Sequence, residues 1–319
     1  MYRQPTPSTI PMNHKLFADS TFLSAGHTGD PTYLIIGVPF DSTSSFRKGS
    51  MHGPDALRQA SYNFESYLPD LDIDLQDLSI VDAGDVDEAG STEDLQAILS
   101  MELDELLGSL KFPQVFPIIL GGEHSLTPMV LGSMLPRFPE TDGKIGVLYL
   151  DAHLDMRESY LGNPMSHACA ARRVSDKVGL DNIIPVGIRS MSREESDFIT
   201  PHLQDHSFQY YGVNDVRDEG AKELGDAILN EFLQNGCDRI YLSIDMDVFD
   251  PSIAPGVGNP EPGGLGYQDV LSLIKPMAKY LCGMDLVETN PVYDQGITAL
   301  LGAKVIREII GMHFHARTL

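Results

Sequence analysis

The chain has 319 residues, of which 42% are hydrophobic, and a formal net charge of −24. This apolar content is enough for a substantial core, and no apolar run reaches the roughly 18 residues that a membrane-spanning helix needs. No Lys or Arg occurs between Arg58 and Lys111, and nucleic-acid binding requires a basic surface, so neither nucleic acid nor a membrane is expected as a partner. A solubilising surface explains the acidic charge; attraction of a cationic substrate and adaptation to a salty host are further explanations.

Neither the N-terminal segment nor the cysteines indicate export from the cell. Residues 1–7 lack a basic region followed by an apolar stretch, so no secretory signal is predicted. Cys169, Cys237 and Cys282 form no paired framework and no Cys-x-x-Cys motif. The sequence therefore predicts buried, reduced thiols in a cytoplasmic protein.

Strands and helices alternate along the chain after an irregular extension over about residues 1–30. Gly53-Pro54 opens a first helix, with the proline in its first turn and apolar residues at helical spacing as far as Phe64. Ser91-Thr92-Glu93 begins a long amphipathic helix. Helical periodicity also marks residues 221–235 and 298–313. Runs rich in Ile, Val and Leu predict strands over residues 33–38, 78–81, 115–120, 145–150, 183–188, 208–211, 239–244 and 283–287.

The predicted strands show almost no alternation of polar and apolar residues. Such strands are buried on both faces, as parallel strands between two helix layers are. Because strands alternate with helices and no linker or repeat intervenes, the sequence predicts a single α/β domain over residues 1–319. We expect three layers, α/β/α, around a mostly parallel sheet of about eight strands, with any site beyond the carboxyl ends of the strands.

Acidic residues and histidines follow three of these strands. The groups are His124 after strand 115–120, Asp151, His153 and Asp155 after strand 145–150, and Asp245 and Asp247 after strand 239–244. Side chains two residues apart in a strand share a face, so Asp245 and Asp247 can converge on one point, as can Asp151 and His153. Asp155 can join them if the chain curls after the strand. Four carboxylates and two imidazoles are too many for one zinc ion. They suit two ions of the Mn²⁺ type, which favour oxygen with some imidazole.

Two divalent ions about 3.5–4 Å apart can share a water and lower its pKa toward neutrality. With four aspartates and a hydroxide, such a centre keeps a net negative charge, which favours a cationic substrate over a phosphate. Each motif also has a plainer explanation: Asp245-x-Asp247 as a turn device, and His124 as a hydrogen-bonded core histidine. Residues 151–155 favour the metal, because burying three such groups without one would be costly.

Several segments resemble the ureohydrolases, the family of arginase, agmatinase and related enzymes. Its three signature regions are matched by residues 121–125 (Gly-Gly-Glu-His-Ser), 151–155 (Asp-Ala-His-Leu-Asp) and 243–251 (Ser-Ile-Asp-Met-Asp-Val-Phe-Asp-Pro). Residues 255–265 and 285–291 add support, and the likeness runs from about Tyr33 onward. The resemblance implies an arginase-like fold, two Mn²⁺ ions per subunit and a homo-oligomer, either a trimer or a hexamer.

The resemblance also implies roles for individual residues. Glu288 matches the carboxylate that holds the substrate guanidinium, and His167 matches a proton-shuttling histidine that also contacts substrate. The alternative for His167 is an ordinary surface or core histidine. Asp155 would accept the first proton of the hydrolysis. The implied metal ligands are His124 and Asp155 for one ion, His153 and Asp247 for the other, and Asp151 and Asp245 as bridges.

The loops around the predicted site bear on the substrate. Residues 46–54 and 156–167 resemble agmatinases of the prokaryotic type, and the second loop does not resemble that of arginases. This implies hydrolysis of agmatine to putrescine and urea, a step of polyamine biosynthesis. The rivals are arginine, guanidinobutyrate and guanidinopropionate; for the last two, Arg157 would pair with the substrate carboxylate. Asn259 stands where many relatives carry Thr, which we interpret as a turn variation.

Three other functions are open to the same residues. A metal-binding homologue without catalytic activity would be expected to have lost ligands, and the chain keeps all six together with Glu288. A two-metal phosphoesterase would need Lys or Arg near the metals, and the signature segments carry none. Residues 255–265 lack the Lys-Ser/Thr of a phosphate-binding loop and contain Glu261, which argues against a nucleotide site.

Overall fold

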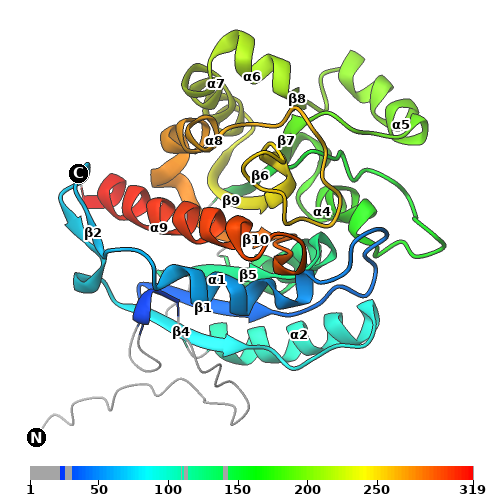
Figure 1. Cartoon of the computed structure of the whole chain (residues 1–319). Helices are drawn as coiled ribbons and strands as arrows, with labels where there is room; N and C mark the ends of the chain where they lie inside the picture. Colours follow the sequence, from blue (N-terminus) through cyan, green and yellow to red (C-terminus); the bar gives the residue numbers. More distant parts are fainter. Residues whose placement is uncertain (1–21, 26–30, 109, 111–113, 139–142, 319) are drawn as a thin grey trace, which may run out of the picture.

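A parallel sheet of eight strands forms the centre of the protein (Figure 1). A computed structural model describes residues 22–25, 31–108, 110, 114–138 and 143–318. The strand order is β4-β1-β5-β10-β9-β6-β7-β8, and every neighbouring pair is parallel. These strands are β1 (Tyr33–Val38), β4 (Ile80–Asp85), β5 (Phe116–Gly121), β6 (Lys144–Leu150), β7 (Ile183–Ile188), β8 (Tyr211–Gly212), β9 (Cys237–Asp245) and β10 (Leu281–Val287). The predicted sheet is confirmed.

Helices cover both faces of this sheet and complete the three predicted layers. One face packs against α1 (Gly53–Ser61), α6 (Val213–Glu219), α7 (Ala221–Gln234), α8 (Tyr267–Ile274) and α9 (Ile297–Thr318). The other packs against α2 (Thr92–Gly108), α3 (Thr127–Met134), α4 (Ala170–Val178) and α5 (Arg193–Gln204). Strand β1 shows why the pattern has no polar alternation: Tyr33 and Ile35 enter one core cluster, and Leu34 and Ile36 enter the other.

Strand β4 lies further along the chain than the predicted 78–81, and it continues through acidic residues that resemble a loop. Asp82 is 1% exposed and Asp85 ends the strand. Both pair with Arg58 of α1, whose Nε lies 2.9 Å from Asp82 and whose Nη1 lies 2.5 Å from Asp85. A buried carboxylate is tolerated in a strand when a cation and hydrogen bonds compensate its desolvation, and that partner lies on another element.

Three short features differ from the sequence-based expectation. The predicted strand over residues 208–211 is reduced to the two residues of β8, and Phe208 is a buried core residue before it. Helix α1 ends at Ser61, before Phe64. A two-stranded antiparallel hairpin, β2 (Tyr67–Leu68) with β3 (Ile73–Asp74), was not predicted, because two residues are too few to show a period.

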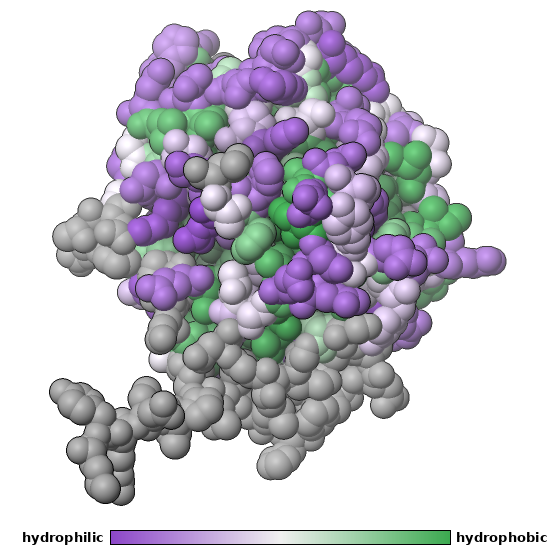
Figure 2. Space-filling model, turned by 90° about the vertical axis from the view of Figure 1, so that its left-hand side faces the viewer, coloured by the Kyte–Doolittle hydropathy of each residue, from purple (hydrophilic) through white to green (hydrophobic). Residues whose placement is uncertain are grey.

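The polar surface and the unpaired cysteines agree with what the composition predicted. The face seen in Figure 2 is largely hydrophilic, with hydrophobic residues in small separate patches. No helix within the described ranges is long and apolar enough to cross a membrane. Cys169 and Cys237 are buried and unpaired as predicted, whereas Cys282 is also unpaired but only partly buried. The predicted extension over residues 1–30 lies outside the described residues except for 22–25.

Candidate metal centre

Four neighbouring strands, β5, β10, β9 and β6, bring the predicted site residues to one edge of the sheet. His124 lies just beyond the end of β5, Asp151 just beyond β6 and Glu288 just beyond β10, while Asp245 is the last residue of β9. In a parallel sheet all carboxyl ends point the same way, so residues far apart in sequence meet there.

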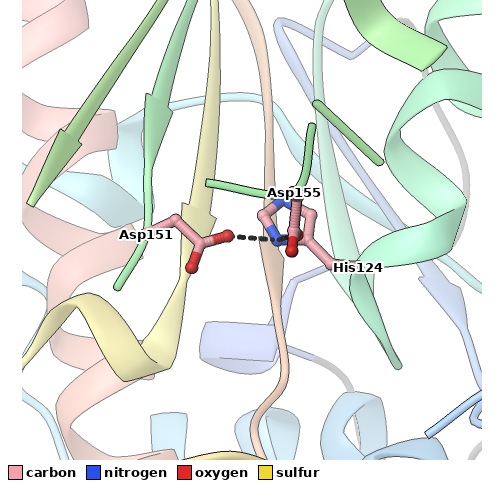
Figure 3. Close-up of side chains that lie close together, drawn as sticks. All are labelled: His124, Asp151 and Asp155. Carbon is pink, nitrogen blue, oxygen red and sulfur yellow. Dashed lines mark ion pairs between the residues drawn. The ribbon is translucent and has the colours of Figure 1, made fainter. Parts of the chain in front are cut away.

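His124 is the centre of a first group of donors (Figure 3). Its Nδ1 atom lies 3.0 Å from Asp151 Oδ2 and 3.9 Å from Asp155 Oδ2. Asp245 Oδ2 lies 3.2 Å from the same nitrogen. The donor atoms of His124, Asp151 and Asp155 are all within 4.8 Å of one another, a spacing that allows them to hold one metal ion.

His153 is the centre of a second group. Its Nδ1 atom lies 2.9 Å from Asp247 Oδ2 and 3.5 Å from Asp151 Oδ1. The donors of Asp151, His153 and Asp247 also lie within 4.8 Å of one another. Asp151 thus belongs to both groups through different oxygens, as a bridging ligand would. Asp245, the other predicted bridge, contacts His124 of the first group through Oδ2, and its Oδ1 accepts a hydrogen bond of 2.8 Å from the backbone N–H of Asp247 in the second group.

The donors have the chemistry that a metal requires. Asp151 Oδ2 is buried and has no directed hydrogen bond from any described residue, although His124 lies close to it. Ser243 Oγ lies 2.8 Å from His124 Nε2 and donates its own hydrogen to Asp285 at 2.6 Å. The serine oxygen therefore accepts from Nε2–H, which leaves the Nδ1 lone pair directed at the carboxylates. The residues fit a bound divalent cation.

The electrostatics of the site show how strongly it attracts cations. Burial raises the pKa of Asp155 well above its usual value, and the nearby charge of Asp151 adds to the shift. Burial and the charge of Asp247 raise the pKa of Asp245 in the same way. Burial opposes protonation of His153, yet the charge of Asp247 and the contact with Asp151 raise its pKa. The raised carboxylate pKa values reflect the cost of burying several negative charges together, a cost that a bound cation would offset.

Backbone strain and close packing occur at the same residues. Asp155 has φ 52° and Glu288 has φ 62°, both in the left-handed region that non-glycine residues avoid. Two glycines beside them are closely packed. A Cβ on Gly122 would lie 2.0 Å from the carbonyl oxygen of Phe40, and one on Gly258 would lie 2.8 Å from Glu288 Oε2. The signature glycines allow the loops to close around the site.

A cavity of about 360 Å³ opens over the two groups. Glu288 lies in its wall and is 5% exposed, and Glu288 Oε1 accepts a hydrogen bond of 3.0 Å from the backbone N–H of His124. Burial and the charge of Glu123 raise the pKa of Glu288 well above its usual value. His167 lines the same cavity, so the structure brings the predicted histidine to the site. Burial, together with the charges of His153 and His124, lowers the pKa of His167 to about 4.

Three residues beside the candidate metal ligands were not predicted from the sequence. Tyr149 stacks on His124 with ring centroids 4.4 Å apart, and its hydroxyl donates to Asp155 Oδ2 at 3.0 Å. Ser243 and Asp285 hold the other side of the His124 ring. Both are polar residues inside apolar strands, and a buried polar residue needs a partner. A polar residue that interrupts an apolar strand is the sequence signal that could have indicated Ser243 and Asp285.

Fold and site together define an α/β protein with a carboxylate–imidazole centre suited to two metal ions. The chain belongs to the arginase family, whose sequence model matches residues 31–311, and this confirms the resemblance in the signature segments.

Known proteins are similar to this chain over most of its length. The chain is 35% identical to an agmatinase of Pyrococcus horikoshii over 89% of this chain and 92% of that protein. It is 36% identical to an N(1)-aminopropylagmatine ureohydrolase of Thermococcus kodakarensis, over 88% of this chain and 90% of that protein. The solved structure of an agmatine ureohydrolase of Thermoplasma volcanium is also similar, with a TM-score of 0.78 and 35% identity over 90% of this chain and 91% of that one.

Proposed function

We propose that this protein hydrolyses the guanidino group of agmatine and releases putrescine and urea. The observation that carries the proposal is the position of Glu288, a buried carboxylate in the cavity wall directly beside the paired donor groups. Relatives named as agmatinases over most of the chain support the same reaction. The catalytic residues would be Asp155, His167 and Glu288, and the metal ligands His124, Asp151, His153, Asp155, Asp245 and Asp247.

Glu288 would bind the guanidinium. Its Oε1 is held by the N–H of His124 and keeps a second lone pair, while Oε2 faces the loop at Gly258. A planar guanidinium donates paired hydrogen bonds to such a carboxylate, which fixes its carbon over the centre. Bound divalent ions supply Lewis acidity and lower the pKa of water toward neutrality. Water adds to the guanidinium carbon and gives up a proton to Asp155. The bond from that carbon to the alkyl nitrogen then breaks, urea is released, and the amine leaves protonated while His167 exchanges protons with solvent.

The charges around the cavity favour a substrate with a second cation over one with a carboxylate. Glu195 and Glu261 line the cavity, and Glu261 is solvent-exposed enough to meet a substrate tail. Arg157, the predicted partner for a carboxylate, lies 3.8 Å from Glu195 and 3.9 Å from Glu194. Its guanidinium also lies over the ring of Tyr160, 5.2 Å from the centroid. A substrate carboxylate would have to compete with these partners, so we favour agmatine over guanidinobutyrate and guanidinopropionate.

The remaining properties are part of the same proposal. The two ions would be Mn²⁺, because the site offers carboxylates and imidazoles and no thiolate. We also propose a cytoplasmic homo-oligomer in which residues 1–319 form one ureohydrolase domain. Size-exclusion chromatography with light scattering tests the assembly, and a monomer at working concentration would contradict it.

A substrate panel tests the reaction. The Mn²⁺-loaded protein is assayed for urea with agmatine, N(1)-aminopropylagmatine, arginine, guanidinobutyrate and guanidinopropionate. We expect the highest kcat/KM for agmatine. A tenfold preference for any other member would refute the substrate while leaving the chemistry in place, and absence of urea from all five would refute the function.

Arg157→Met then tests the substrate preference. The variant removes a charge but keeps an unbranched side chain, so turnover of agmatine should stay within about threefold of the parent, because the side chain contributes no attraction to a cation. If guanidinobutyrate is turned over by the parent and lost selectively in Arg157→Met, the carboxylate-bearing substrate is the correct one.

A further inference from the structure

Thr43, in the loop after β1, contacts His167 through its hydroxyl group. The buried carboxylate of Glu123, which follows β5, holds that hydroxyl. His167 begins a short 3-10 turn (His167–Cys169) before α4 and is 8% exposed. Its Nδ1 lies 3.1 Å from Thr43 Oγ1, and its Nε2 lies 3.4 Å from Ser45 Oγ, which lines the cavity. The two ring nitrogens therefore have different surroundings, one toward the protein and one toward the site.

Glu123 determines the direction of these hydrogen bonds. Its carboxylate is fully buried and is surrounded by groups that donate to it. The backbone N–H of Thr43 donates to Oε2 at 2.8 Å, and the Thr43 hydroxyl donates to Oε1 at 2.5 Å. The hydroxyls of Ser125 and Ser44 donate at 2.7 Å and 3.2 Å. With these donors around it, the carboxylate acts as the acceptor in each contact.

Thr43 has one hydroxyl hydrogen, and Glu123 takes it. Toward His167, the threonine oxygen can therefore only accept hydrogen bonds. It already accepts one from the backbone N–H of His167 at 3.0 Å. Neutral His167 satisfies this arrangement when its hydrogen is on Nδ1, because the other tautomer would place two acceptors face to face. Ser166 Oγ, 3.3 Å from Nδ1, is a hydroxyl that can also accept this hydrogen.

We propose that Glu123 and Thr43 are positioning residues that fix His167 in the tautomer protonated at Nδ1, so that Nε2 is the atom that gains and loses protons in the cavity. The tautomer follows from the directions of the hydrogen bonds, and the role of Nε2 rests on the proposed shuttle role of His167. In either charge state Nδ1 keeps its hydrogen and its contact with Thr43. The ring thus exchanges a proton at Nε2 without turning, as a shuttle requires.

The matched variants are Thr43→Val, which has nearly the same shape and no hydroxyl, and Thr43→Ser, which keeps the hydroxyl. Both are loaded with Mn²⁺, and their metal content is checked against the parent. Removing a group that orients a catalytic imidazole typically lowers activity by about 10- to 100-fold. We expect that loss in kcat for Thr43→Val with KM within about twofold, and recovery to within about threefold in Thr43→Ser.

Solid-state ¹⁵N NMR of histidine-labelled protein reads the tautomer directly, and comparison with His167→Gln assigns the signals. The parent and Thr43→Ser should show His167 protonated at Nδ1, and Thr43→Val should show a mixture. An unchanged tautomer in Thr43→Val, or an equal loss of kcat in both Thr43 variants, would overturn the inference. If the parent releases no urea from any guanidino substrate, the proposed function fails, while the NMR comparison still tests the role of Glu123 and Thr43.

Discussion

Replacing Asp151 by Asn is the sharpest test of the paired metal centre. Asp151 contributes Oδ2 to the group around His124 and Oδ1 to the group around His153. Asparagine keeps the size of the side chain and removes its charge. The change should therefore weaken both ions together, whereas Asp247→Asn, which alters the second group alone, should weaken mainly one.

The structure sets the size of the effect. Asp151 is fully buried, and removing one partner of a buried ion pair costs about 3–5 kcal/mol. Since each 1.4 kcal/mol is about tenfold in affinity, we expect binding at each ion to weaken by roughly 10²- to 10³-fold or more. Activity should fall with occupancy at low Mn²⁺ and recover only in part when Mn²⁺ is raised.

Equilibrium dialysis with elemental analysis measures the two affinities, and urea release measures activity. Asp197→Asn, which changes an exposed aspartate of α5 to the same residue, is the matched control and should bind metal like the parent. An Asp151→Asn variant that binds two ions with unchanged affinity would refute the assignment of Asp151 as the shared ligand.

Three further predictions test other parts of the structure. Glu288→Gln should lower kcat/KM for agmatine by about 10²-fold, because a charge-assisted pair of about 1.5–3 kcal/mol is lost; a change under about threefold in urea release would contradict the guanidinium contact. Burial, aided by the charge of Arg317, lowers the pKa of His313 to about 4. Below about pH 6.5 the unfolded chain therefore takes up a proton that the folded chain excludes, and the free energy of unfolding decreases as the pH is lowered. His313→Gln should remove about 2 kcal/mol of that loss between pH 7.5 and pH 5 in urea unfolding, and an unchanged pH dependence of stability would contradict the assignment. Chelation should lower Tm, since ions that bind only the folded state stabilise it, and an unchanged Tm after verified metal removal would argue against the centre.

The sequence alone determined the features that depend on residues close together in the chain, namely the strands and the closely spaced site residues. Apolar runs predicted seven strands of the main sheet, because a strand buried on both faces leaves a continuous hydrophobic pattern, whereas the run over residues 208–211 overlaps β8 only at Tyr211. Asp151, His153 and Asp155 could be predicted as metal ligands for a similar reason, since their spacing is local. The assignment of individual ligands, of Glu288 and of His167 to their roles remains a prediction, although the structure brings these residues together.

Only the tertiary structure decided which distant residues are in contact. Strand β10, the last in the chain, lies between β5 and β9, and this places Glu288 within 3.0 Å of the backbone of His124, 164 residues earlier. The same is true of Arg58 with Asp82, and of Glu123 and Thr43 with His167. Hydrophobic periodicity records which face of a strand is buried and does not record which strand lies beside it. Contacts between strand ends depend on that order, so they appear only when the sheet is assembled.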